Sequence, residues 1–538
     1  MKSQLHLMFT CLFLILSFPY WSLTLAETHE NFLQCFSDHS SNSTSINSTL
    51  IYTPNNPSYF SILNFSIQNP IFSSPSTPKP LFIITPTNAS HIQATIACSR
   101  KHGLQIRVRS GGHDFEGLSY VSDVPFVVID LINFRSINVD AVNRTAWIQA
   151  GATIGEVYYR IAEKSPTLGF PGAIATTLGV GGLFSGGGYG NMLRKYGLSV
   201  DNIVDAEIVD VEGRILDGKS MGEDLFWAIR GGGGGNFGVV LSWKINLVPV
   251  PSTVTVFTIN RNLEQNATKL VHKWQHIASK LDKDLFILVR FQAVNNPSQG
   301  ESTKTIQASF ISLFLGRVDR LLPLMERSFP ELGLVREDCT EMSWIDSVIY
   351  SAGFPSGQSR DVLLQRALQT RAPFKGKSDY VKEPIPEMGL EGIWERLHEE
   401  DVGRALMQMT PYGGKMNEIP EWKTPFPHRA GIIYKILYLV GVDEGGNVTE
   451  SVHINWIRRL YNYMTPYVSK FPREAYVNYR DLDFGTNGNN GTTTYSQARI
   501  WGMKYFKNNF NRLVRVKTLV DPSNFFRNEQ SIPPLPSL

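Results

Sequence analysis

The sequence has little of several features that would define a class of function. Among its 538 residues are four cysteines, and lysine plus arginine exceed aspartate plus glutamate by only 51 − 48 = 3. So small a surplus excludes the basic surface with which nucleic-acid-binding proteins contact phosphates. After the N-terminal segment, no apolar run approaches the ~20 residues needed to span a bilayer. Because 42% of the residues are hydrophobic and 18% are charged, the sequence predicts a globular protein of more than one domain.

Residues 1–26 have the pattern of a secretory signal peptide. Lys2 precedes an apolar run from Leu5 to Phe18, and the small residues Thr24 and Ala26 provide a cleavage site. A single-pass anchor is the alternative, but this run is shorter than the ~20 residues that a membrane span requires. We expect the chain to enter the secretory pathway and to reach the apoplast or the vacuole.

Cysteine usage agrees with secretion. Removal of the signal peptide leaves Cys35, Cys98 and Cys339, which allow at most one disulfide and one free thiol. We predict a Cys35–Cys98 bridge, because it would attach an N-terminal arm of residues 27–74 to the domain that follows. Eight Asn-x-Ser/Thr sites predict extensive glycosylation; they start at Asn42, Asn47, Asn64, Asn88, Asn143, Asn266, Asn447 and Asn490.

Residues 75–250 are predicted to form an α+β domain built around glycine loops. Strand-like runs such as Gln105–Arg109 and Phe126–Asp130 alternate with glycine turns and short helices. Val248-Pro-Val-Pro251 then forms a stiff connector. The glycine loops lie between the strands, where they can approach a ligand.

Residues 251–470 are predicted to form a second α+β domain with an antiparallel sheet. Strand patterns at residues 284–291 and 432–438 are separated by amphipathic helical segments. Residues 471–538 contain a helical segment around residues 497–517 and return to the first domain. We expect substrate to bind between the two domains.

One phosphate-loop pattern occurs in an unsuitable context. Residues 213–220 match GxxxxGK[ST], but Arg214, Ile215 and Leu216 alternate as in a strand. Glu212-Gly213 is typical of a hairpin turn after the strand that precedes it. A hairpin is therefore predicted here, and nucleotide triphosphate binding is not.

Three other glycine segments point to a large ligand. Ser110-Gly-Gly-His113 follows a strand, and its glycines would let a diphosphate approach the backbone. Residues 179–190 are so rich in glycine that we expect neither a helix nor a regular strand, and residues 231–235 repeat the pattern. A flavin dinucleotide has the required size, whereas no GxGxxG opens a helix as a Rossmann site requires. The alternative for the first segment is a surface turn with a solvated histidine.

The sequence resembles the berberine bridge enzyme-like flavoproteins of plants, the group that includes the cannabinoid synthases. The resemblance covers nearly the whole mature chain and rests on five segments, residues 107–120, 179–190, 224–232, 478–483 and 520–526. It implies a vanillyl-alcohol-oxidase/PCMH-type FAD-binding fold with a substrate domain over the flavin ring. It also implies secretion, glycosylation and, in most members, oxidation that uses O2 and releases H2O2. We expect a monomer that takes a phenolic or prenylated small molecule.

The resemblance also implies how FAD is held. His113 matches the histidine that bonds covalently to the flavin, whereas Ala175 replaces the cysteine that forms a second bond and Leu183 replaces a common histidine. We therefore expect one covalent bond, through His113 only, and a weaker oxidant. The remaining predicted cofactor contacts are Arg109, Ser110, Gly111, Gly112, Ser119, Gly179, Gly182, Gly187, Gly190 and Asn478.

Two cations lie on otherwise apolar strand faces. The two-residue period places Arg290 with Phe286 and Leu288, and Lys435 with Ile433 and Leu437. The alternative is that each points to solvent at a sheet edge. The resemblance instead directs both at the substrate.

Three tyrosines complete the candidate site. Tyr479 matches the tyrosine that removes a phenolic proton in the cannabinoid synthases; the less favoured alternative is a packed core tyrosine. Tyr412 and Tyr476 are weaker candidates for the substrate pocket.

Three functions follow from these residues. The first is a Diels–Alderase-type [4+2] cyclase derived from an oxidase, in which Arg290 and Lys435 polarise a dienophile carbonyl. The second is an oxidase or oxidative cyclase in which Tyr479 takes a proton and the flavin takes a hydride. The third is a protein that holds a flavin without turnover.

Overall fold

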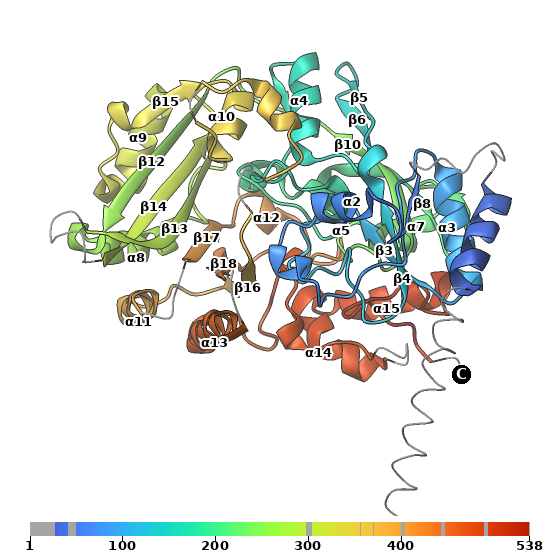
Figure 1. Cartoon of the computed structure of the whole chain (residues 1–538). Coiled ribbons are helices and arrows are strands. Elements are labelled where there is room, and N and C mark those ends of the chain that lie inside the picture. The colour runs from blue at the N-terminus through green and yellow to red at the C-terminus, as the bar shows by residue number, and fades with distance from the viewer. Residues whose placement is uncertain are drawn as a thin grey trace, which may run out of the picture.

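The computed structural model describes residues 27–40, 50–296, 304–355, 357–368, 371–399, 404–442, 447–488 and 493–536. The predicted signal peptide lies outside these residues. None of the helices in the described part of the chain combines the length and the apolar character that a membrane crossing demands. Figure 1 shows two sheet-containing halves side by side.

The first half contains a four-stranded and a five-stranded sheet. The four-stranded sheet has the order β1-β2-β4-β3, and β2 and β3 are parallel to β4. Every residue of β2 and β4 is buried, as expected for central strands covered on both faces. The strands of these two sheets are β1 (Ile51–Tyr52), β2 (Phe82–Ile84), β3 (Gln105–Arg109), β4 (Phe126–Asp130), β5 (Ile137–Asp140), β6 (Thr145–Gln149), β8 (Ile203–Val209), β9 (Ile215–Leu216) and β10 (Val239–Asn246).

Short helices and one small ribbon complete this half. The ribbon pairs β7 (Leu168–Gly169) with β11 (Val248–Pro249), so part of the predicted connector is a strand. Strands β8 and β9 form the hairpin predicted in place of a phosphate loop. The helices are α2 (Tyr59–Phe65), α3 (Ala89–Lys101), α4 (Ile154–Lys164), α5 (Val180–Ser185), α6 (Leu193–Tyr196) and α7 (Gly222–Ile229).

The second half is built on a seven-stranded sheet in which every pair is antiparallel, as predicted. In order across the sheet its strands are β15 (Cys339–Met342), β12 (Val254–Asn262), β14 (Lys304–Phe314), β13 (Leu285–Asn295), β17 (Ala405–Pro411), β18 (Tyr434–Gly441) and β16 (Phe374–Val381). The helices of this half are α8 (Ala267–Ile277), α9 (Val318–Ser328), α10 (Trp344–Ser351), α11 (Glu387–Leu397), α12 (Lys415–Glu418) and α13 (Asn447–Tyr463). The α+β class is thus confirmed.

The two faces of this sheet serve different purposes. On β13, Leu285, Ile287 and Val289 pack into the core shared with α8, α11 and α13. The alternate residues Phe286 and Leu288 belong to the core shared with the first half. Since side chains alternate along a strand, Arg290 lies on this second face. Strands β13 and β18 are interior strands, so the sheet-edge alternative for Arg290 and Lys435 is wrong.

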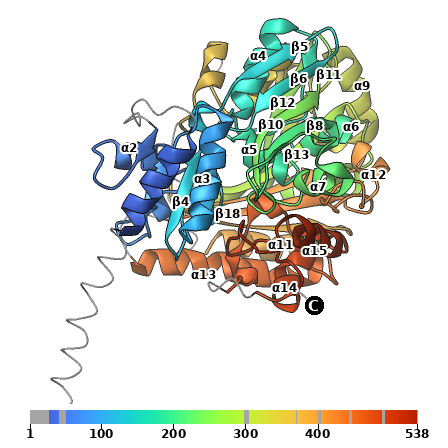
Figure 2. The same cartoon turned by 90° about the vertical axis from the view of Figure 1, so that its right-hand side faces the viewer.

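The C-terminal segment lies beneath the first half (Figures 1 and 2). The helical segment predicted around residues 497–517 is in fact two helices, α14 (Tyr495–Phe506) and α15 (Asn509–Val520). Lys507 interrupts them with a φ of 48°, which lets α15 turn back and place Phe510 against Gly502 of α14. The packing of Phe510 on Gly502, which local sequence does not encode, therefore determined that the helical segment breaks at Lys507.

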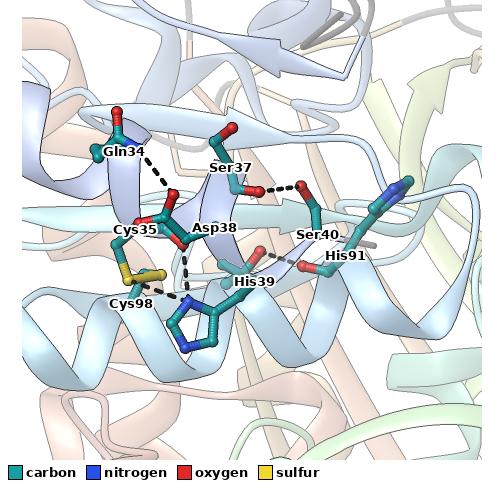
Figure 3. Close-up of a disulfide and its surroundings, with 9 residues drawn as sticks. Gln34, Cys35, Ser37, Asp38, His39, Ser40, His91 and Cys98 are labelled. Atoms are coloured by element: carbon teal, nitrogen blue, oxygen red, sulfur yellow. Dashed lines mark hydrogen bonds between the residues drawn. A yellow bond between two sulfur atoms is a disulfide. The ribbon is translucent and has the colours of Figure 1, made fainter. Parts of the chain in front are cut away.

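The predicted disulfide joins Cys35 to Cys98 of α3 (Figure 3). Cys339 is free and partly buried. The bridge attaches the N-terminal helix at residues 27–39 to the first half.

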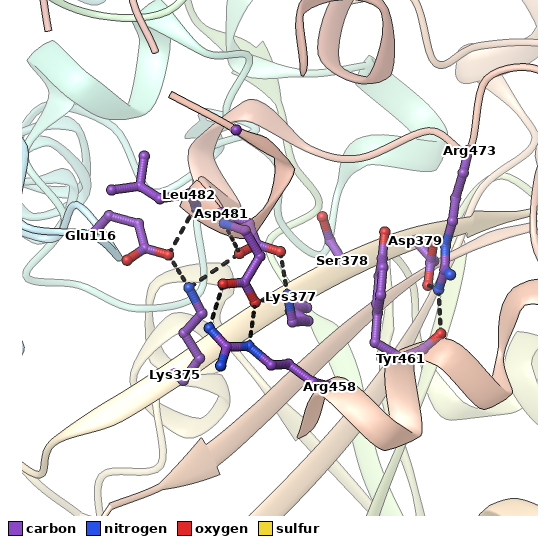
Figure 4. Close-up of polar contacts among 12 residues, drawn as sticks. Glu116, Lys375, Lys377, Ser378, Asp379, Arg458, Tyr461, Arg473, Asp481 and Leu482 are labelled. Carbon is purple, nitrogen blue, oxygen red and sulfur yellow. Dashed lines mark hydrogen bonds and ion pairs between the residues drawn. The ribbon is translucent and has the colours of Figure 1, made fainter. Parts of the chain in front are cut away.

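A buried ionic cluster joins three distant segments (Figure 4). Lys377 of β16 donates to Asp481 and Asp483, each at 2.6 Å, and is only 2% exposed. Lys375 pairs with Asp481 at 3.1 Å and with Glu116. The cluster therefore ties the segment after His113 and the segment after Tyr479 to the seven-stranded sheet.

Candidate active site

A cavity of about 550 Å³ lies between the glycine loops of the first half and the inner face of the seven-stranded sheet. This size is typical of a pocket for a cofactor or a small substrate. Eleven of the predicted site residues line it: Ser110, Gly111, Gly112, His113, Ser119, Gly179, Gly182, Arg290, Tyr476, Asn478 and Tyr479.

Five predicted site residues do not line this cavity: Arg109, Gly187, Gly190, Tyr412 and Lys435. Arg109 forms a buried ion pair with Asp130 at 2.6 Å and donates to two backbone carbonyls, so its side chain has a structural role. The side chain of Arg107, two residues earlier on β3, lines the cavity instead. Residues two apart on a strand share a face, so strand alternation does not separate Arg109 from Arg107; the ion pair with Asp130 and the two carbonyl contacts hold the Arg109 side chain away from the cavity.

Gly187, Gly190 and Tyr412 also do not line the cavity, and each is held by packing. A Cβ on Gly190 would collide with the carbonyl oxygen of Gly172, and Gly187 packs against the Phe426 ring. The hydroxyl of Tyr412 donates to Tyr380 at 3.5 Å, away from the cavity. These three residues therefore stabilise the backbone outside the cavity lining.

The first two glycine loops pack directly on each other. A Cβ on Gly111 would collide with the backbone nitrogen of Gly179, and Gly112 combines a φ of +70° with a close approach to Ser66. Only glycine satisfies both demands. The expectation that residues 179–190 contain no helix was wrong, since Val180–Ser185 is helical. The carbonyls of residues 152 and 150 accept from the first N–H groups of this helix and so compensate its glycine content.

His113 is held in a neutral form. Burial lowers the pKa of its imidazole to about 4, and its Nε2 lies 2.9 Å from the Thr177 hydroxyl in a hydrogen bond. This bond leaves Nδ1 as the available nitrogen. Ala175 lines the same cavity and has no group that could form a bond to a cofactor.

The residues present fit a flavin dinucleotide. A Cβ on Gly182 would meet no atom within 4 Å, and Gly235, with a φ of +72°, is similarly open. The Ser119 hydroxyl is buried in the cavity wall without a hydrogen-bond partner. An open glycine cradle and an unpartnered hydroxyl are what a bound polar ligand would use.

Two tyrosines meet in the wall of the cavity. The hydroxyls of Tyr189 and Tyr479 form a very short hydrogen bond, and the Tyr479 ring stacks on Phe115 with ring centroids 4.9 Å apart. Burial raises the pKa of Tyr189 to about 12 and that of Tyr479 well above its usual 10. A shared proton between two phenols allows one hydroxyl to give or take a proton while the other stabilises the charge.

Lys435 lies behind these rings and is fully buried. Its Nζ is 3.1 Å from the ring centroid of Tyr189 and 4.7 Å from that of Tyr479, and it has no hydrogen-bond partner among the described atoms. Burial lowers its pKa well below 10.5. Lys435 therefore acts on the site through the rings and not by direct contact with a ligand.

Of the two predicted catalytic cations, Arg290 is the one that lines the cavity. Its Nη2 donates to Gln408 Oε1 at 3.3 Å, and Gln408 Nε2 donates to Thr410 at 3.3 Å. Thr410 in turn interacts with Tyr189 and lowers the pKa of its hydroxyl. A polar chain thus runs along the sheet from Arg290 to the tyrosine pair.

Sequence reasoning missed Tyr189, Thr177 and Gln408. Tyr189 lies between Gly188 and Gly190, and a large aromatic residue inside a glycine run is a signal that could have identified it. Gln408 and Thr410 had no such signal, because their positions depend on the pairing of β17 with β13 and β18.

Two family models match the chain. Residues 80–219 match an FAD binding domain, and residues 475–533 match a domain described as "Berberine and berberine like". The first match contains the glycine loops at residues 110–113 and 179–190, and the second contains Tyr479; these segments meet at the cavity.

Relatives of similar length agree with both models. The chain is 53% identical to cannabidiolic acid synthase-like 1 of Cannabis sativa, over 98% of this chain and 97% of that protein. It is 55% identical to a tetrahydroberberine oxidase of Berberis wilsoniae, over 95% and 94%. The solved structure of BBE-like #28 from Arabidopsis thaliana has a TM-score of 0.88 at 50% identity, covering 94% of this chain and 100% of that one.

Proposed function

Since this chain belongs to the berberine bridge enzyme-like family of FAD-dependent oxidoreductases, we propose that it oxidises a largely apolar small molecule with an ionisable hydroxyl group. The fold is the PCMH-type FAD fold of this family. The observation that supports the proposal is the Tyr189–Tyr479 hydroxyl pair in the cavity wall, above the buried Lys435. A phenol or an allylic or benzylic alcohol is the class of substrate that such a pair would deprotonate.

The first step of the proposed reaction is proton removal. Tyr479 accepts the proton of the substrate hydroxyl, and Tyr189 donates its hydrogen bond to the oxygen that carries charge. Phe115, stacked on Tyr479, fixes the plane of its ring and excludes water from that face. When bound, FAD would supply the acceptor for a hydride, which leaves the carbinol carbon of an alcohol or a benzylic or allylic carbon conjugated with a phenol.

Lys435 adjusts the basicity of this pair. A positive charge beneath the Tyr189 ring stabilises a phenolate and lowers the pKa of the tyrosines, whereas burial favours the neutral amine. Movement of one proton from the tyrosine pair to Lys435 leaves the buried cluster with no change in net charge. The three groups therefore titrate as one unit.

Two groups of residues would hold FAD, one at its flavin and one at its polar part. His113 would form the single covalent bond, because its imidazole is neutral and its Nε2 is already engaged by Thr177. The open loops at Gly182 and Gly235 and the Ser119 hydroxyl would receive the polar part of the cofactor.

A second candidate is the [4+2] cyclase predicted from the sequence. Arg290 favours it, since donors that face the cavity can polarise a dienophile carbonyl without electron transfer. Lys435 was expected to share this role, but it lies behind the tyrosine rings and does not line the cavity. Oxidation is therefore the function that the site supports best.

An anaerobic experiment separates these functions. Purified holoenzyme is mixed with phenols and allylic alcohols, with and without prenyl groups, and the flavin absorbance and products are followed. Oxidation requires bleaching of the flavin in step with product, and cyclisation requires product without bleaching. Neither product nor bleaching with any compound would favour a flavin-holding protein without turnover. Reoxidation is then measured with O2 and with a dye, because one relative is named an oxidase and another solved relative, Phl p 4, a glucose dehydrogenase.

We also propose a secreted, glycosylated monomer. The Cys35–Cys98 bridge supports an oxidising compartment. Four of the glycosylation sites, at Asn64, Asn88, Asn143 and Asn266, have exposed asparagines. Intact mass before and after deglycosylation, together with light scattering, tests both statements.

A further inference from the structure

We propose that Arg290, held by Gln408, is a subsite for a carboxylate group of the substrate. This inference rests on the proposed function and narrows it from a hydroxylated apolar molecule to a hydroxylated carboxylic acid. It begins from the contrast between Arg290 and the other buried arginines of the chain.

Other buried arginines are neutralised within the protein. Arg109, Arg429 and Arg473 form ion pairs at 2.6 to 2.8 Å with buried or nearly buried aspartates, Asp130, Asp201 and Asp379. Arg194 has no ion pair but donates to a ring of backbone carbonyls, which includes those of Tyr412, Asp282 and Leu281. Arg290 has neither arrangement among the described residues. Arg290 is partly buried, and burial lowers the pKa of its guanidinium; because a desolvated charge is normally paired, its counter-ion is expected from a ligand.

The one bond that Arg290 makes orients it toward the cavity. Gln408 uses its Oε1 on Arg290 and its Nε2 on Thr410, so both ends of the amide are engaged. Arg290 Nε is buried without a partner, and the side chain lines the cavity. Because Nε is shielded and one Nη2 donor is used by Gln408, the remaining N–H donors of Nη1 and Nη2 are the ones available to a ligand, and they form a planar fork that matches a carboxylate.

The surroundings specify the rest of the ligand. Leu406, Leu437 and Leu439 line the cavity on the same sheet face as Arg290 and offer contact only to an apolar body. Among the described residues that line the cavity, Asp114 is the only acidic one, and it faces Arg480 at 3.6 Å. A carboxylic acid on an aromatic or prenylated skeleton would pair its charge with Arg290 and place its apolar body against the three leucines.

The subsite lies close to the proposed base. The charge of Arg290 lowers the pKa of Tyr189, although burial has the larger, opposite effect. The polar chain through Gln408 and Thr410 joins the two directly. The carboxylate and the reacting hydroxyl of the substrate are therefore expected at the same end of the molecule.

Binding without turnover tests this inference. Oxidised holoenzyme is titrated with hydroxybenzoic, hydroxycinnamic and prenylated hydroxybenzoic acids and with their methyl esters, and the perturbation of the flavin spectrum gives each Kd. At least one acid should bind about 10- to 100-fold more tightly than its ester, as expected for a bidentate, charge-assisted contact. Arg290→Gln should remove this preference. If no acid outperforms its ester, or if the preference survives in Arg290→Gln, the inference is wrong.

A second pair of variants distinguishes the loss of the carboxylate subsite from misfolding of the protein. Gln408→Glu places a carboxylate beside Arg290 and should abolish the preference while FAD stays bound. Gln292→Glu, an exposed position on the same strand, is the matched control and should keep it. Competition by inorganic phosphate but not by benzoate would overturn the choice of a carboxylate. Acid binding without flavin reduction would contradict the proposed oxidation and leave this subsite intact.

Discussion

The Nζ of Lys435 lies 3.1 Å from the centre of the Tyr189 ring, in a fully buried position without a hydrogen-bond partner. A buried amine with aromatic faces around it is costly to charge unless a negative group forms beside it. A phenolate on the Tyr189–Tyr479 pair would be that group. The charge of Lys435 and the basicity of the tyrosines are therefore linked.

Replacement of Lys435 tests this link through the pH dependence of flavin reduction. A tyrosine acts as a base only after it loses its proton, so the rate should rise with pH toward the pKa of Tyr479, which burial raises well above 10. Lys435→Met removes the stabilising cation, raises the pKa of the pair, and should shift the rise to higher pH with a loss of about 10- to 100-fold near pH 7. Stopped-flow measurement from pH 6 to 10 gives both profiles. Lys415→Met, a surface variant, is the control; coincident profiles would mean that Lys435 does not act on the base.

The two tyrosines are expected to act as a unit. Tyr479→Phe and Tyr189→Phe should each slow flavin reduction by about 10²- to 10⁴-fold, the usual contribution of a general base. Because the two hydroxyls are hydrogen-bonded to each other and act on the same substrate proton, the double variant should be little slower than the worse single variant. Single-turnover rates of the three variants check this. Multiplicative losses would show that the hydroxyls work independently.

The covalent linkage of FAD depends on His113. His113→Ala should release FAD into the supernatant after acid precipitation, whereas the wild type should retain it through one bond. Thr177→Val removes the hydrogen bond to Nε2 and should slow incorporation of the bond without abolishing it. Ala175→Cys should raise the flavin potential if a second bond forms. Peptide masses decide how many bonds are present, and free release of FAD from the wild type would contradict the role of His113.

Two glycines of the same site should respond in opposite ways. Gly182→Leu fills open space in the cavity, so soluble, folded protein should form with little bound FAD. Gly111→Ala places a methyl group against the backbone of Gly179 and should prevent folding. Far-UV circular dichroism and the ratio of flavin to protein absorbance measure the two effects. Gly182→Ala, which adds only a methyl group to open space, should retain FAD.

The ionic cluster of Figure 4 predicts a stability difference between two cations. Lys377→Met leaves the buried Asp481 without a full partner and should cost about 3 to 5 kcal/mol of the free energy of unfolding. Arg458, whose side chain is 48% exposed, pairs with Asp483 in the same cluster. Arg458→Met should cost about 1 kcal/mol or less, since exposed ion pairs contribute little. Urea unfolding compares the two, and equal losses would contradict the role assigned to burial.

The two-residue periodicity of the strands predicted on which sheet face candidate site residues lie, but it did not predict what packs against that face. The two-residue period correctly placed Arg290 with Phe286 and Leu288 on one face of β13. The same argument placed Lys435 on the corresponding face of β18, yet Tyr189 from a distant loop covers it. A strand pattern states which side a residue faces, and it contains no information about what packs against that side.

The glycine pattern by itself determined that the backbone must pass unusually close to something. It did not distinguish a ligand from another part of the chain: Gly111 and Gly179 face each other, whereas Gly182 and Gly235 face open space. The His113 loop was recognisable in the sequence because its residues are neighbours, and the Cys35–Cys98 pair, although 63 positions apart, because few cysteines are present. The tyrosine pair, the Arg290–Gln408 contact and the position of Lys435 join residues that are more than 100 positions apart. Only the packing of the seven-stranded sheet against the glycine loops decided them, because burial and hydrogen bonding are set by distance in space and not along the chain.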